Sequence, residues 1–412
     1  MMVKTPLNQE DVIKIKKVLT KFQAGYTKRN VEVLDDFIGE VFVQNERMIT
    51  VGTSRSEWCF GRNELKELLK SDWMYWGNLT VNIENAKINT KGNSAWFLAD
   101  STISWDTTED AEEWRQDLVD DFFKKNGRFV HFSPAARVAM LNEKLLFIMK
   151  SFAHKQKEPL TFPIRLSGGL VRQDQSFRIN RLHFSVPMKS FPEWRIDKNN
   201  PDSLKYYNQI KKRMLHYNEL FDDECREEIT ELLHNLRAHY LGKTNPTQLI
   251  KKLFSSYDDN YVVDPNENPA AIGNNHIEKI LILQRQKWDE FVLNIEEALI
   301  HTEGDTASII TSGIFRKSFL SNEFLQKELH GMKETLQKEG KGEGQLFKAQ
   351  KQIAHTIKEL SFGEEALWEF RFEATAIKEK GKWKFHNLQF TYPSLHLFEG
   401  NYRMIPLLST DQ

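Results

Sequence analysis

An internal repeat constrains the fold of this chain more than any other feature. Residues 81–95, VNIENAKINTKGNSA, and residues 293–307, LNIEEALIHTEGDTA, share eight identities in fifteen positions without a gap, at an offset of 212 in a chain of 412 residues. Further segments extend the match: 61–69 with 273–281 and Trp76 with Trp288 at the same offset, and 165–187 with 371–393 at an offset of 206. We therefore expect one structural unit twice, and 48.4 kDa is enough for two domains.

Each unit combines early helices with a later run of strands. Residues 11–26 place apolar side chains at three- and four-residue spacing, which predicts an amphipathic helix. The Lys91-Gly92-Asn93 turn, between two segments of strand character, predicts a hairpin. The expected order is helix, helix, strand, helix and four antiparallel strands, with helical inserts before the last two strands. This order favours an α+β fold.

The boundary between the units is expected near residue 200. Residues 188–203 contain two prolines and a polar cluster, as a linker does, and an amphipathic helix follows them. We expect a first domain over 1–190, a linker and connecting helix over 191–221, and a second domain over 222–412.

Composition excludes several classes of function. The 57 basic and 58 acidic side chains nearly cancel, so no overall field attracts nucleic acid. No apolar run approaches a signal peptide or the roughly 20 residues of a membrane span. Cys59 and Cys225 are too few for a disulfide framework or a four-cysteine zinc site. We expect a cytoplasmic protein without a nucleic-acid or membrane partner, a metal or a cofactor.

The order of elements, with the motif GNSAWF (92–97) after the hairpin turn, resembles the SnoaL-like branch of the nuclear transport factor 2-like superfamily, which also contains ketosteroid isomerase. The second half carries the resemblance through 257–273 and 304–310. The first half carries it through nine residues: Gly52, Glu57, Gly61, Asp72, Trp76, Gly92, Ala95, Trp96 and Phe97. The resemblance implies two cone-shaped domains, each a curved antiparallel sheet wrapped around helices and enclosing a pocket. It leaves the chemistry open, because this scaffold hosts isomerases, cyclases, dehydratases and binding modules.

The segment VVDP resembles the ketosteroid isomerase segment whose aspartate moves a proton next to a carbonyl, which makes Asp264 a candidate base. A carboxylate in an apolar pocket can exchange protons near neutral pH. The alternative is a turn in which this carboxylate caps backbone amides. Gly52 takes the aligned place in the first half, so no equivalent base is expected there. Where the isomerases present a tyrosine from the early helix, we find Arg237 and His234 in the second half and Phe22 in the first.

The strand after the Gly92 turn contributes a second candidate acid. Alternate residues of a strand share a face, so Trp96 and Asp100 lie on one side of the sheet. If that face is the concave one, Asp100 points into the pocket of the first half. The alternative is an aspartate at a wet strand end, solvated or paired with an arginine.

Aromatic residues near the third helix are candidates for a ligand site. Three of them lack aromatic counterparts in the second half, which sets them apart from the shared fold; the alternative is ordinary core packing. The candidate ligand-binding residues are Glu57, Trp58, Trp73, Tyr75, Trp96 and Arg237.

Three functions remain open. The favoured one is a tandem protein that binds a small apolar or aromatic molecule without established catalysis. The second is an isomerase, dehydratase or cyclase that uses Asp264 or Asp100. The third is a protein-interaction module with a side-chain-filled pocket. In each case the two domains are expected to pack as an internal pseudo-dimer, in a chain that is a monomer or a homodimer.

Overall fold

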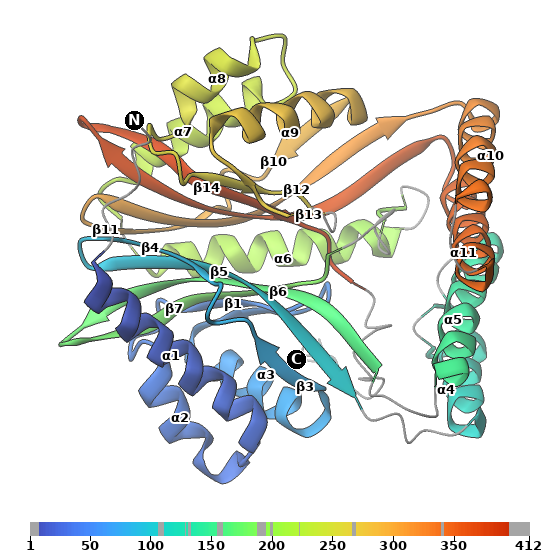
Figure 1. Ribbon diagram of the computed structural model, residues 1–412, viewed down its shortest axis with the longest axis horizontal. Coiled ribbons are helices and arrows are strands. Elements are labelled where there is room, and N and C mark those ends of the chain that lie inside the picture. The colour runs from blue at the N-terminus through green and yellow to red at the C-terminus, as the bar shows by residue number, and fades with distance from the viewer. Residues whose placement is uncertain are drawn as a thin grey trace.

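The computed structural model describes residues 8–105, 111–127, 129–130, 133–154, 160–187, 195–197, 201–221, 223–265, 269–338 and 342–394. The described chain forms two layers of sheet packed face to face, with helices on the outer face of each sheet (Figure 1). The expected α+β fold of two similar units is confirmed.

The first half begins with helices and closes with a seven-stranded sheet. Its elements before the insert are α1 (Gln9–Lys28), η1 (Val31–Val33), α2 (Leu34–Val41), β1 (Ile49–Val51), β2 (Trp58–Phe60), α3 (Gly61–Tyr75), β3 (Asn78–Val81), β4 (Lys87–Lys91) and β5 (Ser94–Trp105). The insert α4 (Ala111–Phe123) and α5 (Pro134–His154) follows, and then β6 (Leu160–Gln173) and β7 (Ser176–Ser185). The strand order is β2-β1-β7-β6-β5-β3, and β4 pairs with β5.

The connecting helix α6 (Pro201–Glu219) leads into a second half with the same element order. Its elements are α7 (Arg226–His239), α8 (Pro246–Leu253), β8 (Tyr261–Val263), β9 (Ala271–Ile272), α9 (Asn274–Lys287), β10 (Glu290–Leu293), β11 (Leu299–Glu303), β12 (Thr306–Ser318), α10 (Ser321–Gln337), α11 (Gly342–Ser361), β13 (Glu365–Glu379) and β14 (Lys382–Thr391). The strand order β9-β8-β14-β13-β12-β10, with β11 on β12, repeats that of the first sheet.

Irregular positions are repeated as faithfully as the strands. Gly92 and Gly304 lie in the turns of the matched hairpins. Their φ angles are 59° and 58°, a conformation that glycine adopts without strain. A register shift between Gly169 and Leu170 in the first sheet has its counterpart between Thr375 and Ala376 in the second. The repeat in the sequence is therefore a repeat of backbone geometry.

Neither sheet is wholly antiparallel, which corrects one detail of the expectation. β1 runs parallel to β7, and β8 runs parallel to β14. A long connection separates the two strands of each pair, so hairpin signals in the sequence could not indicate this pairing.

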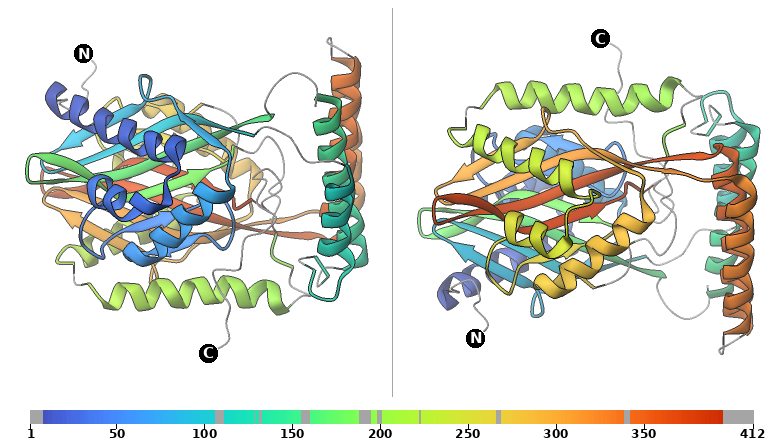
Figure 2. Two further views of the ribbon diagram at one scale, coloured as in Figure 1. Left: turned by 90° about the horizontal axis from the view of Figure 1, so that it is seen from below. Right: turned by 90° about the horizontal axis from the view of Figure 1, so that it is seen from above.

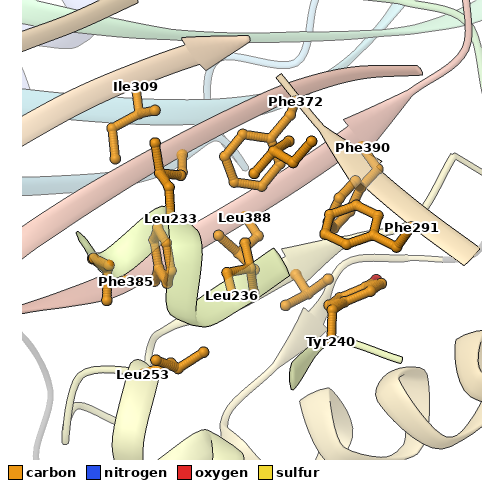
Figure 3. Close-up of a cluster of buried hydrophobic side chains, with 14 of the residues drawn as sticks. Leu233, Leu236, Tyr240, Leu253, Phe291, Ile309, Phe372, Phe385, Leu388 and Phe390 are labelled. Atoms are coloured by element: carbon orange, nitrogen blue, oxygen red, sulfur yellow. The ribbon is translucent and has the colours of Figure 1, made fainter. Parts of the chain in front are cut away.

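Each sheet buries one face against its own helices. In the second half, leucines of α7 pack on the phenylalanines of β12 to β14, and Tyr240 closes the cluster (Figure 3). Phe22 and Tyr26 of α1 have the corresponding position in the first half, in ring contact with Phe184 of β7. The interior of each unit is lined by aromatic rings.

The other face of each sheet packs on the other sheet, and the contacts follow a pseudo-twofold axis. Two contacts join equivalent positions: the hydroxyl of Thr306 donates to that of Ser94 at 2.6 Å, and the hydroxyl of Ser167 donates to Glu373 at 2.8 Å. Others occur as equivalent pairs. Arg165 donates to the carbonyl of Asp264 at 3.0 Å, and its counterpart Arg371 donates to the carbonyl of Gly52. The contact between the halves is thus isologous.

The connecting helix α6 runs along one side of the two sheets (Figure 2). Its Ile210, Met214 and Tyr217 form one buried cluster with residues of both halves: Val51, Trp58, Leu299 and Ile310. Residues 191–194 and 198–200 of the expected linker lie outside the described part of the chain, and the expected boundaries stay a prediction.

The helical inserts of the two halves meet at one end of the molecule (Figure 1). α5 packs against α11, α4 lies against α5 and α10 lies against α11. Residues 195–197 join this region to the second sheet, because Arg195 forms an ion pair with Glu359 at 2.7 Å and the amide of Ile196 donates to the carbonyl of Leu367.

Candidate functional site

A buried tyrosine and a buried aspartate meet in the interior of the first half. The hydroxyl of Tyr26, in the last turn of α1, donates to a carboxylate oxygen of Asp72 on α3 at 2.6 Å. Burial, then Asp72 and then Glu57 raise the pKa of Tyr26, so this phenol stays protonated. Arg29 holds the two helix ends together by donating to the carbonyls of Tyr26 and Trp76.

Glu57 reaches the same interior because residue 52 is glycine. A Cβ added to Gly52 would lie 2.1 Å from Oε2 of Glu57, so any larger residue would displace this carboxylate. The amide of Ser54 donates to the same oxygen at 2.8 Å. The residue aligned with Asp264 is glycine, as the sequence shows, and Glu57 brings a carboxylate to the place where a side chain at residue 52 would begin.

The second half builds a related cluster from different residues. Asp264 directly follows β8, and the side-chain amide of Gln284 donates to its carboxylate. The indole N–H of Trp288 donates to the side-chain carbonyl oxygen of the same Gln284 at 2.7 Å. Burial, followed by Asp264, raises the pKa of Tyr240, and burial followed by Asp264 also raises that of Tyr392.

Lys287 adds a cation near this second cluster. Its ammonium lies 4.9 Å from the ring centre of Trp288 and 5.4 Å from that of Trp368. Burial lowers its pKa, and the neighbouring Asp264 partly offsets that effect.

The two clusters are built at equivalent positions of the two halves, but their charges differ. Tyr26 corresponds to Tyr240 and Trp76 to Trp288, whereas Asp72 corresponds to Gln284. The first half therefore places two carboxylates around its tyrosine, and the second places one carboxylate and an amide. A protonated tyrosine beside carboxylates can donate a hydrogen bond to a polar group of a ligand, while the carboxylates can accept one or take a proton.

The face that carries Trp96 is not the concave one. Trp96 and Leu98 pack against Tyr261 and Val263 of the second half, so this face is part of the contact between the sheets. Asp100 is exposed on that side. It lies opposite Arg165 on β6, and Asp100 and Asp264 both raise the pKa of this arginine against the effect of burial. Asp100 therefore lies beside the contact of Arg165 with Asp264 and not in the interior of the first half.

The remaining candidate residues are dispersed. Trp58 lies in the cluster under α6, with the guanidinium of Arg371 5.7 Å from its ring. Trp73 lies in the first core beside Phe37, and Tyr75 is exposed. Arg237 donates to the carbonyl of Leu293 and contacts His234. Only Glu57 of the proposed ligand-binding set lies at the cluster around Tyr26.

Sequence reasoning missed Tyr26 and Asp72 as site residues in the first half, and Tyr240 and Gln284 in the second. The repeat did contain a signal for them. Both tyrosines align, and Asp72 aligns with an uncharged residue at the offset that aligns the neighbouring tryptophans. A charge that changes between equivalent buried positions marks a place where the halves diverge.

Within the described residues, no three histidine, cysteine, aspartate or glutamate side chains are grouped as a metal site would require. Among the helices that the structure describes, none is long and apolar enough to cross a membrane.

Each of three solved structures that resemble this chain covers about half of it. No family model and no curated protein matches the chain. Among solved structures, it is similar to a nuclear transport factor 2-like superfamily protein from Salmonella enterica serovar Typhimurium LT2, with 11% identity and a TM-score of 0.28 over 44% of this chain and 95% of that one.

Two further structures show the same coverage of about half of this chain. An NTF2-like protein with a cystatin-like fold from Novosphingobium aromaticivorans has 11% identity and a TM-score of 0.28, over 50% of this chain and 99% of its own. An NTF2-like protein of unknown function from Pseudomonas putida KT2440 has 8% identity and a TM-score of 0.27, over 45% and 92%. The likeness concerns the fold alone.

Proposed function

We propose that the first half binds a small, largely apolar or aromatic molecule with one polar group. In this proposal Tyr26, Asp72 and Glu57 form hydrogen bonds with that polar group. The observation that carries the proposal is the pair of buried carboxylates around one buried tyrosine. Aromatic rings of Phe22, Trp76 and Phe184 surround the same tyrosine.

The cost of burying these acids supports a functional reading. Removing a carboxylate from water is unfavourable unless hydrogen bonds or charges compensate for it. The raised pKa of the neighbouring Tyr26 is of the kind that gathers at functional sites. The fold itself does not require both acids, because the second half forms the same elements with Gln284 in place of Asp72.

The first experiment is native mass spectrometry of the purified chain, followed by release and identification of whatever remains bound. We expect one small molecule per chain. The matched variant is Asp72→Gln, which gives the first half the residue that the second half uses at this position. It should lose the bound molecule while keeping its helical circular dichroism signal.

Tyr240→Phe serves as the control in the second half and should retain the molecule. A wild-type chain that carries nothing, and that no compound of an aromatic metabolite library stabilises against heat, would contradict the proposal. So would equal retention by the Asp72→Gln variant.

A second candidate function is proton transfer next to a carbonyl, as an isomerase, dehydratase or cyclase performs it. One observation favours it: each half places an acid, Glu57 or Asp264, near a tyrosine whose pKa is raised. Such a phenol can donate to a developing oxyanion while the acid moves the proton. Turnover of an identified ligand that Glu57→Gln or Asp264→Asn abolishes would establish this function over binding alone.

Pairing with another protein through a sheet face receives less support. The faces by which such domains pair sheet to sheet are already packed on one another within this chain. A protein partner would have to use another surface.

A further inference from the structure

The helices of the inserts carry apolar side chains on their exposed side. On α5 these are Val138, Leu145 and Met149, and on α11 they are Leu346, Ile353 and Ile357. In both helices the spacing is seven and then four residues, which places the three side chains in one stripe along the helix. Their exposed fractions are 65, 40 and 63% on α5 and 64, 45 and 44% on α11.

The last turns of α11 bury charged side chains and expose apolar ones. Its buried residues include Lys358 and Glu359, each 1% exposed, and the ion pair of Glu359 with Arg195 lies on this inner side. The isoleucines lie outside, where a helix of a monomeric protein normally presents charged residues. Single exposed apolar residues are common, but an aligned set on two packed helices marks an interaction surface.

The spacing indicates what covers the stripes. Positions i, i+7 and i+11 are the a and d positions of a heptad pattern, which pack against a second helix with the same pattern. α5 and α11 occupy the same place in the element order of the two halves and pack side by side. Each stripe fits a helix that carries the same pattern, and a twofold-related copy of the chain supplies one when α5 of one copy faces α11 of the other.

The size of the surface fits this partner. The six side chains expose on the order of 500 Å² of apolar area, which matches the largest patch of a typical monomer, about 300–600 Å² and often functional. A stable dimer buries roughly 800 Å² on each copy. The neighbouring α10, which packs on α11, carries three more exposed leucines: Leu325, Leu329 and Leu336, exposed by 37, 56 and 51%.

We propose that the stripes of α5 and α11 form the interface through which this chain dimerises. The two sheets then pair within each chain, and the helical inserts pair between chains.

The test is sedimentation equilibrium of the full chain with a matched pair of double variants. Wild type should have twice the mass of 48.4 kDa at about 50 μM. Ile353→Glu/Ile357→Glu should weaken dimerisation at least about tenfold, because charges replace the stripe. Ile282→Glu/Leu283→Glu, at two exposed apolar residues of α9 outside the stripes, should leave it unchanged.

Cross-linking keeps the test decisive if the stripe variant does not fold. Chains with Met149→Cys, mixed with chains carrying Ile353→Cys, should join through a short bis-maleimide into a product of twice the chain mass. A wild-type chain that stays monomeric at about 100 μM, or a stripe variant that dimerises as tightly as wild type, would overturn the proposal.

Discussion

Glu373 receives three polar contacts from side chains of the first half. It lies 3.0 Å from Arg181 and 3.0 Å from His183, and it accepts a hydrogen bond from Ser167. Burial alone would raise its pKa, but Arg181 and the donors from His183 and Ser167 outweigh burial and hold the pKa at about 2. Because the carboxylate only accepts, Nδ1 of His183 carries the proton, and Nε2 accepts from the hydroxyl of Thr391 at 3.0 Å.

We expect Glu373→Gln to destabilise the chain by about 3–5 kcal/mol, because it leaves the guanidinium of Arg181 buried without its counter-charge. The measurement is urea denaturation at pH 7. Arg181→Asn gives this position the residue of its counterpart Asn387. The double variant should be more stable than the sum of the two single effects predicts, and strict additivity would count against a direct interaction.

At the scale of elements, the sequence predicted what depends on local pattern. The helix over 11–26, the Gly92 hairpin and the repeated order of elements were all predictable, because periodicity and turn residues specify them. The sequence did not predict the parallel pairing of β1 with β7, nor the position of the Glu57 carboxylate beside Gly52. Both depend on which segments meet in space after the chain has closed on itself.

The face of a strand was the least predictable property. Alternation correctly separated Trp96 from Phe97, and the structure puts Phe97 in the first core and Trp96 between the sheets. Both faces of β5 are buried, so hydrophobicity could not say which face was concave.

The connecting helix α6 gives a test of how strongly the halves are joined. Met214 is fully buried between them, whereas the next residue, Leu215, is 46% exposed. Met214→Ala should lower stability by about 2–5 kcal/mol and move the unfolding of both halves together, because its cavity borders residues of each. Differential scanning calorimetry measures this. Leu215→Ala is the control and should shift the transition little; equal effects would mean that α6 does not hold the halves together.

At the scale of the whole molecule, two buried histidines and one half-buried histidine make the contact between the halves sensitive to acid. Burial is the largest cause lowering the pKa of His183 and of His301, and it lowers that of His386 to about 4. The folded state therefore binds fewer protons than the unfolded state below the ordinary histidine pKa of about 6.5. Stability is highest above this pH and falls as the pH drops from about 6.5 toward 4.

The repeat supplies the variants that test this dependence. The equivalent positions of His183, His301 and His386 hold amides: Gln389, Asn89 and Asn180. The triple variant His183→Gln/His301→Asn/His386→Asn should flatten the fall in the free energy of unfolding between pH 6.5 and 4.5, measured by urea denaturation at each pH. An unchanged slope would assign the acid sensitivity to carboxylates instead.

The contact of Ser167 with Glu373 on the pseudo-twofold axis has a consequence for the choice of partner. In a symmetric homodimer, a residue on the axis faces its own copy, so Glu373 would meet another glutamate and two buried negative charges would repel. Two halves that differ in sequence avoid this, because a hydroxyl can meet a carboxylate. Because the two halves are linked in one chain, Ser167 and Glu373 can form an unlike pair at the centre of a contact that is otherwise nearly symmetric. Each half is now a better partner for the other than for another copy of itself.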